Sequence, residues 1–233
     1  MAAPVTHIIL AFATLFNCLA LRFMPQQEVL VGTSFPDIRY LNVVPRNSTH
    51  VTKPHSLLWQ EIKQCRNPFY VGILIHSLVD ICQVDFMLKT KIFQTIPELN
   101  DDPHRLKLFH DLVLYPKGIT WIHDWPSITR YFDDYLFAER AYGVSDEMLD
   151  VWHMRLKSYF SQGLDPYVMQ PALPAYVLPG LEELILDKHL NHTLTSGTHQ
   201  FFLSFILGII DDFHDYQKTL TLATSMDFED NVL

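Results

Sequence analysis

Apolar residues recur with helical spacing over most of the chain, and proline-containing segments separate these stretches. The helices that this pattern predicts cover residues 7–22, 56–64, 68–93, 101–115, 126–142, 145–160, 181–190 and 198–220. Breakers of regular structure interrupt the segment from Gln26 to Val51, which is predicted to be irregular, and they are Gly32, Pro36, Pro45 and Asn47. The predicted fold class is all-α.

Capping residues support several of these boundaries. Thr6 is the expected N-cap of the first helix, Ser145 is that of the helix ending near Phe160, and Pro68 suits a first helical turn. Pro116, followed closely by Gly118, is expected to end the helix that begins near residue 101.

Composition agrees with a helical globular protein. The chain has 233 residues, 48% of them hydrophobic, which suits a single compact domain over residues 1–233. Glycine is sparse, with 8 residues, and this disfavours a turn-rich β architecture. The acidic tail from about residue 225 is expected to fray.

The apolar run from His7 to Phe23 has some features of a secretory signal. However, no lysine or arginine precedes it, and no small-x-small cleavage site follows it. The run is also short for a membrane span. We expect a buried first helix and no transmembrane segment. Three cysteines with no metal-ligand spacing favour reduced thiols and a cytoplasmic location.

The charge balance limits the partners that the protein can attract. A net charge of −9 argues against broad attraction to duplex nucleic acid. A phosphate held locally through a bound cation remains compatible with this charge.

His76 and Asp80 are the strongest chemical signal. A four-residue step on a helix returns within about 40° of its starting direction, so both side chains share one face of an apolar helix. Imidazole and carboxylate together are good ligands for zinc or a similar metal. A buried His-Asp pair that is satisfied by its own hydrogen bond is the structural alternative.

Other polar residues in the first third of the chain suggest a larger site. His7 opens the first helix, Asp37 follows Phe35-Pro36 in the segment predicted to be irregular, and His50 follows Ser48-Thr49. Hydrolysis of a phosphodiester uses cations held by His and Asp, which polarise phosphoryl oxygens and activate water. This set of residues fits that chemistry.

The order of these motifs resembles the zinc-dependent phospholipase C family, whose superfamily includes fungal single-strand nucleases. The resemblance covers about the first 80 residues: Ala3-Pro-Val-Thr-His7, Gly32-x-x-x-Pro-Asp37, Thr49-His50 and Gly72-x-x-x-His76-x-x-x-Asp80. It implies an all-α fold with one to three zinc ions. The metal ligands that it implies are His7, Asp37, His50, His76 and Asp80, and Asp37 would also be the bridging carboxylate and catalytic base.

The chain departs from the family on the next helix, because the expected His-x-x-x-Glu pair is missing. Three residues of the sequence from His104 to Asp111 are candidates instead. We predict His110 as a further metal ligand, with His104 and Asp111 as alternatives. His153, among aromatic residues, is predicted to be a packed side chain rather than a ligand.

Arg39 and Arg46 flank the proposed site and are candidate substrate-binding residues, because a guanidinium fork matches a phosphate. An ion pair with a nearby acid is the alternative for each. The expected substrate is a small-molecule or lipid phosphoester, and the loop from Pro166 to Pro179 is a candidate apolar mouth for a lipid. The sequence does not fix the oligomeric state.

Two other functions fit the same residues. A helical phosphohydrolase of the His-Asp type would use His76, His110-Asp111 and a later acid such as Asp133, and would leave His7 and Asp37 without a role. A non-catalytic helical binding or scaffold protein would keep these side chains for structural reasons or as a vestigial metal site.

Overall fold

The computed structural model describes residues 4–99, 103–122, 125–161 and 184–210, and every regular element in these ranges is helical. The all-α prediction is therefore confirmed. The longer helices are α1 (Pro4–Asn17), α2 (Gln26–Ser34), α4 (His55–Gln64), α5 (Pro68–Thr90), α7 (Pro103–Ile122), α10 (Asp146–Ser161) and α12 (Lys188–Ile210). The short ones are η1 (Phe35–Leu41), α3 (Arg46–Thr49), α6 (Ile92–Thr95), η2 (Pro97–Leu99), α8 (Trp125–Thr129), η3 (Arg130–Phe132) and α9 (Phe137–Arg140).

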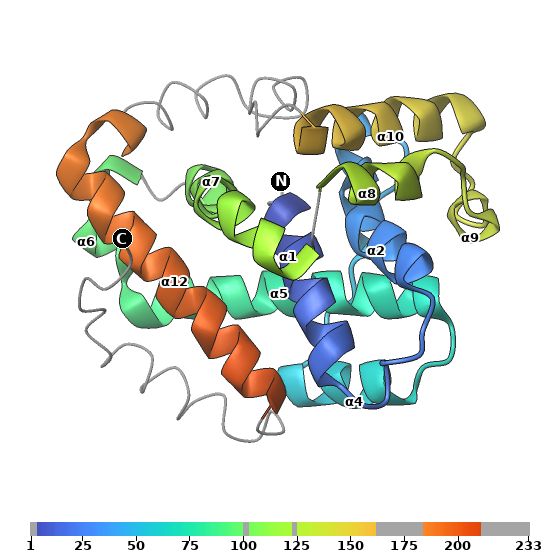
Figure 1. The fold of residues 1–233 in the computed structure, drawn as a ribbon, viewed down its shortest axis with the longest axis horizontal. Coiled ribbons are helices and arrows are strands. Elements are labelled where there is room, and N and C mark those ends of the chain that lie inside the picture. Colours follow the sequence, from blue (N-terminus) through green and yellow to red (C-terminus); the bar gives the residue numbers. More distant parts are fainter. Residues whose placement is uncertain (1–3, 100–102, 123–124, 162–183, 211–233) are drawn as a thin grey trace.

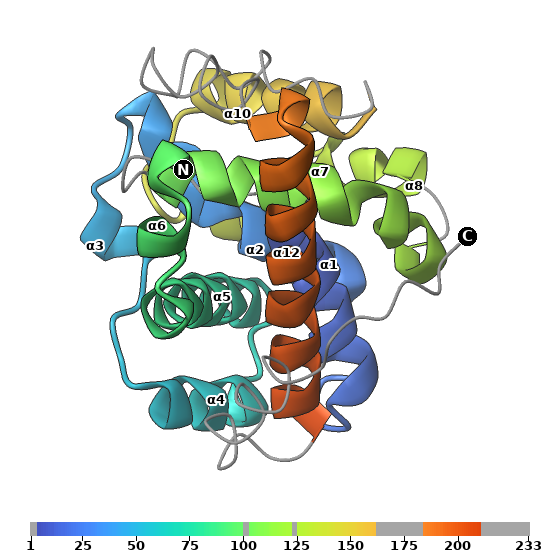
Figure 2. The same ribbon diagram turned by 90° about the vertical axis from the view of Figure 1, so that its left-hand side faces the viewer.

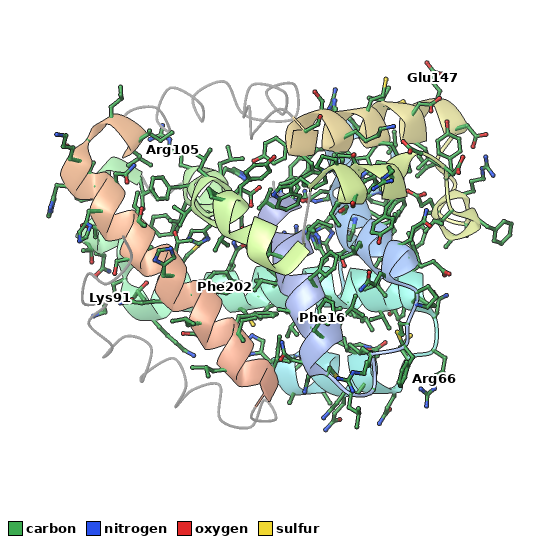
Figure 3. The ribbon with its side chains drawn as sticks, viewed as in Figure 1. Phe16, Arg66, Lys91, Arg105, Glu147 and Phe202 are labelled. Carbon is green, nitrogen blue, oxygen red and sulfur yellow. The ribbon has the colours of Figure 1, made fainter. Side chains whose placement is uncertain are left out.

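Helices α1 and α5 form the centre of the protein. Helix α2 packs along α5, α1 contacts α2, α5, α7 and α12, and α4 covers the other side of α5. Figures 1 and 2 show α5 between α4 on one side and α2 with α10 on the other, while α12 crosses over α5 and α7. Charged side chains such as Arg66 and Glu147 lie on the outside (Figure 3).

Helix α5 is long and apolar enough to cross a membrane, but 78% of its most apolar window is buried inside the protein. Its neighbours α2 and α4 cover it instead of lipid. Helix α5 is therefore a core helix of this fold. All three cysteines lie in the described ranges, Cys18 and Cys82 are buried and Cys65 is half-buried, and none forms a disulfide.

Several predicted boundaries are correct. Helices α4, α5 and α10 match the predicted helices 56–64, 68–93 and 145–160 to within a few residues. Pro68 lies in the first turn of α5, and the backbone N–H of Met148 donates to the Ser145 hydroxyl at 3.4 Å. His153 is buried, and its Nε2 lies 2.8 Å from Glu139 Oε1, so it is the packed side chain that was predicted.

Other boundaries are wrong. Helix α7 continues through Pro116, and at this turn Tyr115 stacks on Trp125 and donates to the carbonyl of Phe160 at 2.6 Å. The predicted helix 126–142 is three short helices, and α12 is continuous where two helices with a gap between them were expected. The acidic tail and the Pro166–Pro179 loop lie outside the described residues.

The segment from Gln26 to Val51 is also helical rather than irregular, with α2, η1 and α3 inside it. Gly32 permits a close crossing instead of breaking α2: a Cβ there would lie 2.1 Å from the carbonyl oxygen of Phe69. Gly72 does the same from α5, where a Cβ would lie 2.2 Å from the carbonyl oxygen of Val29. The two glycines therefore set how closely α2 and α5 approach.

Gly72→Ala is expected to lower the free energy of unfolding by at least the ~1–3 kcal/mol typical of an overpacked core, because backbone atoms cannot move aside as a side chain can. Gly197→Ala on α12 is the matched control, since its Cβ would meet Ile92 Cδ1 at an ordinary 3.8 Å. The control is expected to be neutral or stabilising by up to ~1 kcal/mol. Urea unfolding of both variants tests this, and equal stabilities would contradict the close crossing.

Candidate metal centre

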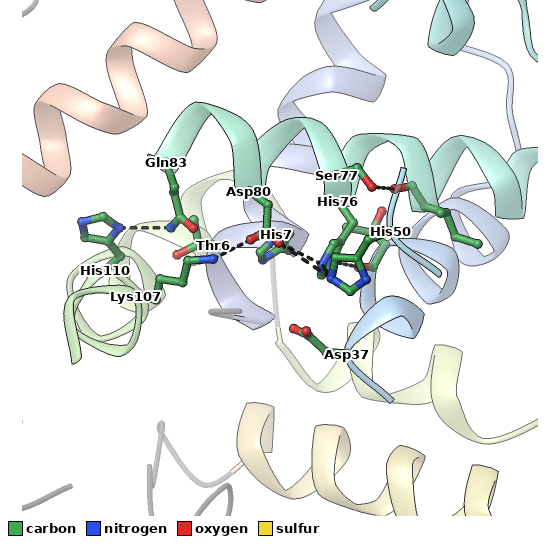
Figure 4. A network of polar contacts seen from close by, with 12 residues as sticks. Thr6, His7, Asp37, His50, His76, Ser77, Asp80, Gln83, Lys107 and His110 are labelled. Atoms are coloured by element: carbon green, nitrogen blue, oxygen red, sulfur yellow. Dashed lines mark hydrogen bonds and ion pairs between the residues drawn. The ribbon is translucent and has the colours of Figure 1, made fainter. Parts of the chain in front are cut away.

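Five residues from separate elements converge beside the α2–α5 crossing. His7 comes from the first half of α1, Asp37 from η1, His50 from the end of α3, and His76 and Asp80 from α5 (Figure 4). Their ligand-type atoms form two overlapping groups, His7-His76-Asp80 and Asp37-His50-His76, within which all atoms lie within 4.8 Å of one another. All five side chains are buried, so the structure contains buried His/Asp groups that could hold a metal ion.

Backbone and hydroxyl contacts hold these segments in place. Thr49 Oγ1 lies 3.3 Å from the carbonyl oxygen of Pro36, which joins the segment of His50 to that of Asp37. The N–H of Val51 donates to Ser77 Oγ on α5 at 2.9 Å. The residue after His50 is therefore fixed against the helix that carries His76 and Asp80.

His76 has a defined tautomer. Its Nδ1 lies 2.8 Å from the carbonyl oxygen of Thr33, which can only accept a hydrogen bond, so Nδ1 carries the proton. Nε2 is left with a lone pair that points into the cluster. This outer contact is the kind that orients a metal-binding histidine.

The Nε2 atoms of His50 and His76 lie 3.2 Å apart. His50 Nδ1 is 3.1 Å from Thr49 Oγ1, and when that hydroxyl donates to the Pro36 carbonyl, Nδ1 donates to the hydroxyl and Nε2 keeps its lone pair. Two lone pairs then face each other, and a cation between them would turn this repulsion into two bonds.

Asp80 completes a triangle with these two nitrogens. Its Oδ2 lies 3.7 Å from His50 Nε2 and 3.7 Å from His76 Nε2. A point inside a triangle with these sides is about 2 Å from all three atoms, which is the length of zinc bonds to histidine nitrogen and carboxylate oxygen. The residues therefore could hold a metal ion.

The protonation states also suit a metal site. Burial, followed by the neighbouring His76, lowers the pKa of His50 to about 3. Burial, followed by His7, lowers the pKa of His76 well below its usual value, so both imidazoles are neutral. Burial alone would raise the pKa of Asp80, but Lys107, His76 and His7 together hold it well below its usual range. Neutral imidazoles and an ionised carboxylate are the forms that bind metal.

His110 does not lie in either group. Its Nδ1 is 3.2 Å from Gln83 Nε2, its ring stacks on Phe201, and it is fully buried (Figure 4). Lys107, one turn earlier on α7, reaches the site instead, with Nζ donating to Asp80 Oδ1 at 2.6 Å. The sequence pattern had given no role to Lys107.

Asp111 and His104, the two alternative candidates on α7, also do not belong to either group. Asp111 accepts hydrogen bonds from the backbone N–H groups of Val5 and Thr6, so it caps α1 in place of the predicted Thr6. His104 is half-buried and lines a cavity next to Asp80.

That cavity has a volume of about 290 Å³ and a basic lining. Arg39, Arg46 and Lys107 line it together with Asp80 and Asp85. Arg46 Nη2 lies 3.7 Å from Asp80 Oδ2, and Arg39 Nε lies 3.9 Å from Asp37 Oδ1. Both arginines therefore line the cavity next to the candidate ligands, and each forms the ion pair with a nearby acid that was the alternative to substrate binding.

No protein-family model matches the chain, and neither the curated proteins nor the solved structures contain a match to it. The resemblance to zinc-dependent phospholipase C therefore rests on the order of the motifs alone. Function has to be argued from the chemistry of the site.

Proposed function

We propose that this protein is a zinc-dependent phosphoester hydrolase similar to the phospholipase C family. The observation that carries the proposal is the buried triangle of His50, His76 and Asp80, which fits a metal ion and shares Asp80 with a cavity that has a basic lining. Zinc suits a mixed nitrogen and oxygen ligand set of this size. A basic cavity beside such a centre suits a phosphate.

The residues of the metal centre and of the cavity have separate roles in this reaction. Zinc, when bound, supplies Lewis-acid polarisation of a phosphoryl oxygen and makes water more acidic. Asp37, buried beside His50 and His76, accepts the proton of the attacking water. Arg39 and Arg46 hold the remaining phosphoryl oxygens and orient the ester for attack.

The volume of the cavity favours a compact substrate. At about 290 Å³ it lies at the lower end of the ~300–1,000 Å³ range of ligand pockets, so it suits a phosphorylated headgroup or small molecule better than two acyl chains. The walls formed by Ile81, Val84 and Pro103 supply apolar contact beside the charged groups.

The structure gives less support to a His-Asp type phosphohydrolase. Asp111 is used as the cap of α1, His110 lies against Gln83, and Asp133 forms an ion pair with Lys157. None of these three belongs to the His/Asp groups of the described residues. A non-catalytic protein with the same metal site is separated from the enzyme by activity alone.

Hydrolysis of bis(4-nitrophenyl) phosphate and of a short-chain phosphatidylcholine by the zinc-loaded protein tests the proposal. Asp37→Asn is expected to lower kcat by ~10²–10⁴-fold, because it removes the base, while zinc remains bound to the other ligands. Asp133→Asn, an exposed acid away from the site, is the matched control and is expected to keep full activity. Zinc-loaded protein without activity on either ester would favour the non-catalytic alternative.

A cytoplasmic location is the remaining part of the proposal. The absence of a disulfide among Cys18, Cys65 and Cys82 supports a reducing compartment. Cell fractionation with an antibody against the protein tests it, and recovery in the secreted fraction would contradict it.

A further inference from the structure

Helix α7 places a fixed positive charge on the candidate metal centre. Lys107 Nζ donates to Asp80 Oδ1 at 2.6 Å, and the side chains of both residues are only 11% exposed. Figure 4 shows Lys107 approaching Asp80 from the side of α7, opposite His50 and His76. An ammonium this close to a buried carboxylate forms a charge-assisted hydrogen bond.

The two oxygens of Asp80 face different groups. Oδ2 lies 3.7 Å from the Nε2 atoms of His50 and His76, and the largely exposed Arg46 guanidinium lies 3.7 Å from the same oxygen. Oδ1 faces Lys107 and lies 3.7 Å from His7 Nε2. The carboxylate is therefore divided between the triangle on one side and a second site, beside His7, on the other.

His76 cannot serve both sites. Its Nδ1–H donates a hydrogen bond to the Thr33 carbonyl, so the ring has one lone pair that can bind a metal, at Nε2. If that lone pair binds an ion in the triangle, His76 is lost from the group His7-His76-Asp80. An ion beside His7 would then keep only two ligands from that group, His7 and Asp80 Oδ1. Lys107 already holds Oδ1, and a divalent cation on the same oxygen would repel the ammonium.

We propose that Lys107 limits the centre to one metal ion, with its ammonium in the place that a second cation beside His7 would take. The inference rests on the proposed metal site. Lys107 supplies the positive charge that balances Asp80 on the side away from the triangle. Unlike a metal ion, an ammonium group cannot coordinate further ligands. His7 then packs against His76, with ring centroids 4.1 Å apart, rather than binding an ion.

Neutralisation of a buried carboxylate is the simpler role for Lys107, and it predicts a different result. If the ammonium only neutralises Asp80, its removal lowers stability and leaves the number of bound ions unchanged. If it excludes a second ion, its removal raises that number. The stoichiometry of metal binding therefore separates the two roles without reference to activity.

The experiment is an equilibrium titration of the full chain with Zn²⁺, read by elemental analysis, and with Mn²⁺, read by electron paramagnetic resonance. Wild type and Lys107→Arg are expected to bind one ion per chain and to give the spectrum of isolated Mn²⁺. Lys107→Met, which keeps the length without the charge, is expected to bind two ions and to show the spectrum of a coupled pair. Lys157→Met, which removes the exposed partner of Asp133, is the matched control and is expected to stay at one.

The outcomes distinguish this inference from the proposed function. Wild type with no bound ion would remove the metal centre and the hydrolase proposal with it. Two ions in wild type, or an unchanged or lower number in Lys107→Met, would overturn the role of Lys107 and leave the hydrolase proposal standing. If Lys107→Met does not fold, Lys107→Gln, which also lacks the charge but keeps a polar end, is titrated in its place and is expected to bind two ions. One ion in Lys107→Gln would overturn the inference.

Discussion

Alanine at His76 or at Asp80 is expected to abolish metal binding, whereas alanine at His153 leaves it unchanged. His76 and Asp80 supply two of the three atoms of the triangle, so either change leaves too few ligands for the ion. Replacing an outer-shell partner typically costs 10–100-fold in metal affinity, and losing a ligand costs more than that. Elemental analysis of protein purified without added metal and then exposed to one equivalent of zinc measures the effect.

His153→Ala is the matched control because His153 is also buried and also next to a carboxylate, at 2.8 Å from Glu139, but lies outside both groups. Circular dichroism melting shows whether each variant is folded before its metal content is compared. Equal metal content in all three variants would contradict the assignment. A chelator is expected to lower the melting temperature of the wild type and of His153→Ala, because the ion binds only the folded state.

Asp111→Ala is expected to lower the free energy of unfolding by ~3–5 kcal/mol, because it leaves several buried donors without an acceptor at a cost of ~1–3 kcal/mol each. The carboxylate accepts from the N–H groups of Val5 and Thr6 at 3.1 and 2.7 Å, from Thr6 Oγ1 at 2.8 Å and from the Tyr159 hydroxyl at 3.1 Å. It therefore joins α1, α7 and α10, and it fixes the turn of α1 that carries His7. Urea unfolding measures the loss, with Asp133→Asn as an exposed control that is expected to change stability by less than ~0.5 kcal/mol.

The contribution of Asp111 to the free energy of unfolding is expected to decrease as pH rises. Burial raises the pKa of Asp111 to about 7, although the four hydrogen bonds oppose this shift. Because the folded state then binds more protons than the unfolded state between about pH 4 and about pH 7, this group makes the free energy of unfolding fall as pH rises through that window. Asp111→Asn cannot titrate, so the difference in stability between wild type and this variant is expected to change across the window. A constant difference would contradict the raised pKa.

The helical fold followed from local patterns wherever those patterns were strong. Helix α5 is an apolar stretch that begins at a proline, and α10 follows a capping serine, so short-range signals define both. Helix α2 was missed because Gly32 normally breaks a helix. Here the same glycine lets the backbone of α2 approach Phe69 on α5, and this tertiary contact leaves no local signal in the sequence.

The candidate site shows the same division between local and tertiary information. The order of the motifs was enough to select His7, Asp37, His50, His76 and Asp80, which the structure brings together. The contribution of α7 was not predictable, because it depends on how α7 is rotated against α5. Asp80 on α5 contacts Lys107 on α7, and three residues further along both helices Gln83 contacts His110. Lys107 therefore lies at the site, and His110 lies one turn beyond it.

Anomalous diffraction at the zinc edge, from crystals of the protein grown with zinc, tests the central claim most directly. We expect one strong peak per chain, located between His50 Nε2, His76 Nε2 and Asp80 Oδ2 and about 2 Å from each. A zinc peak bound elsewhere on the chain, with these three side chains in contact only with one another, would contradict it.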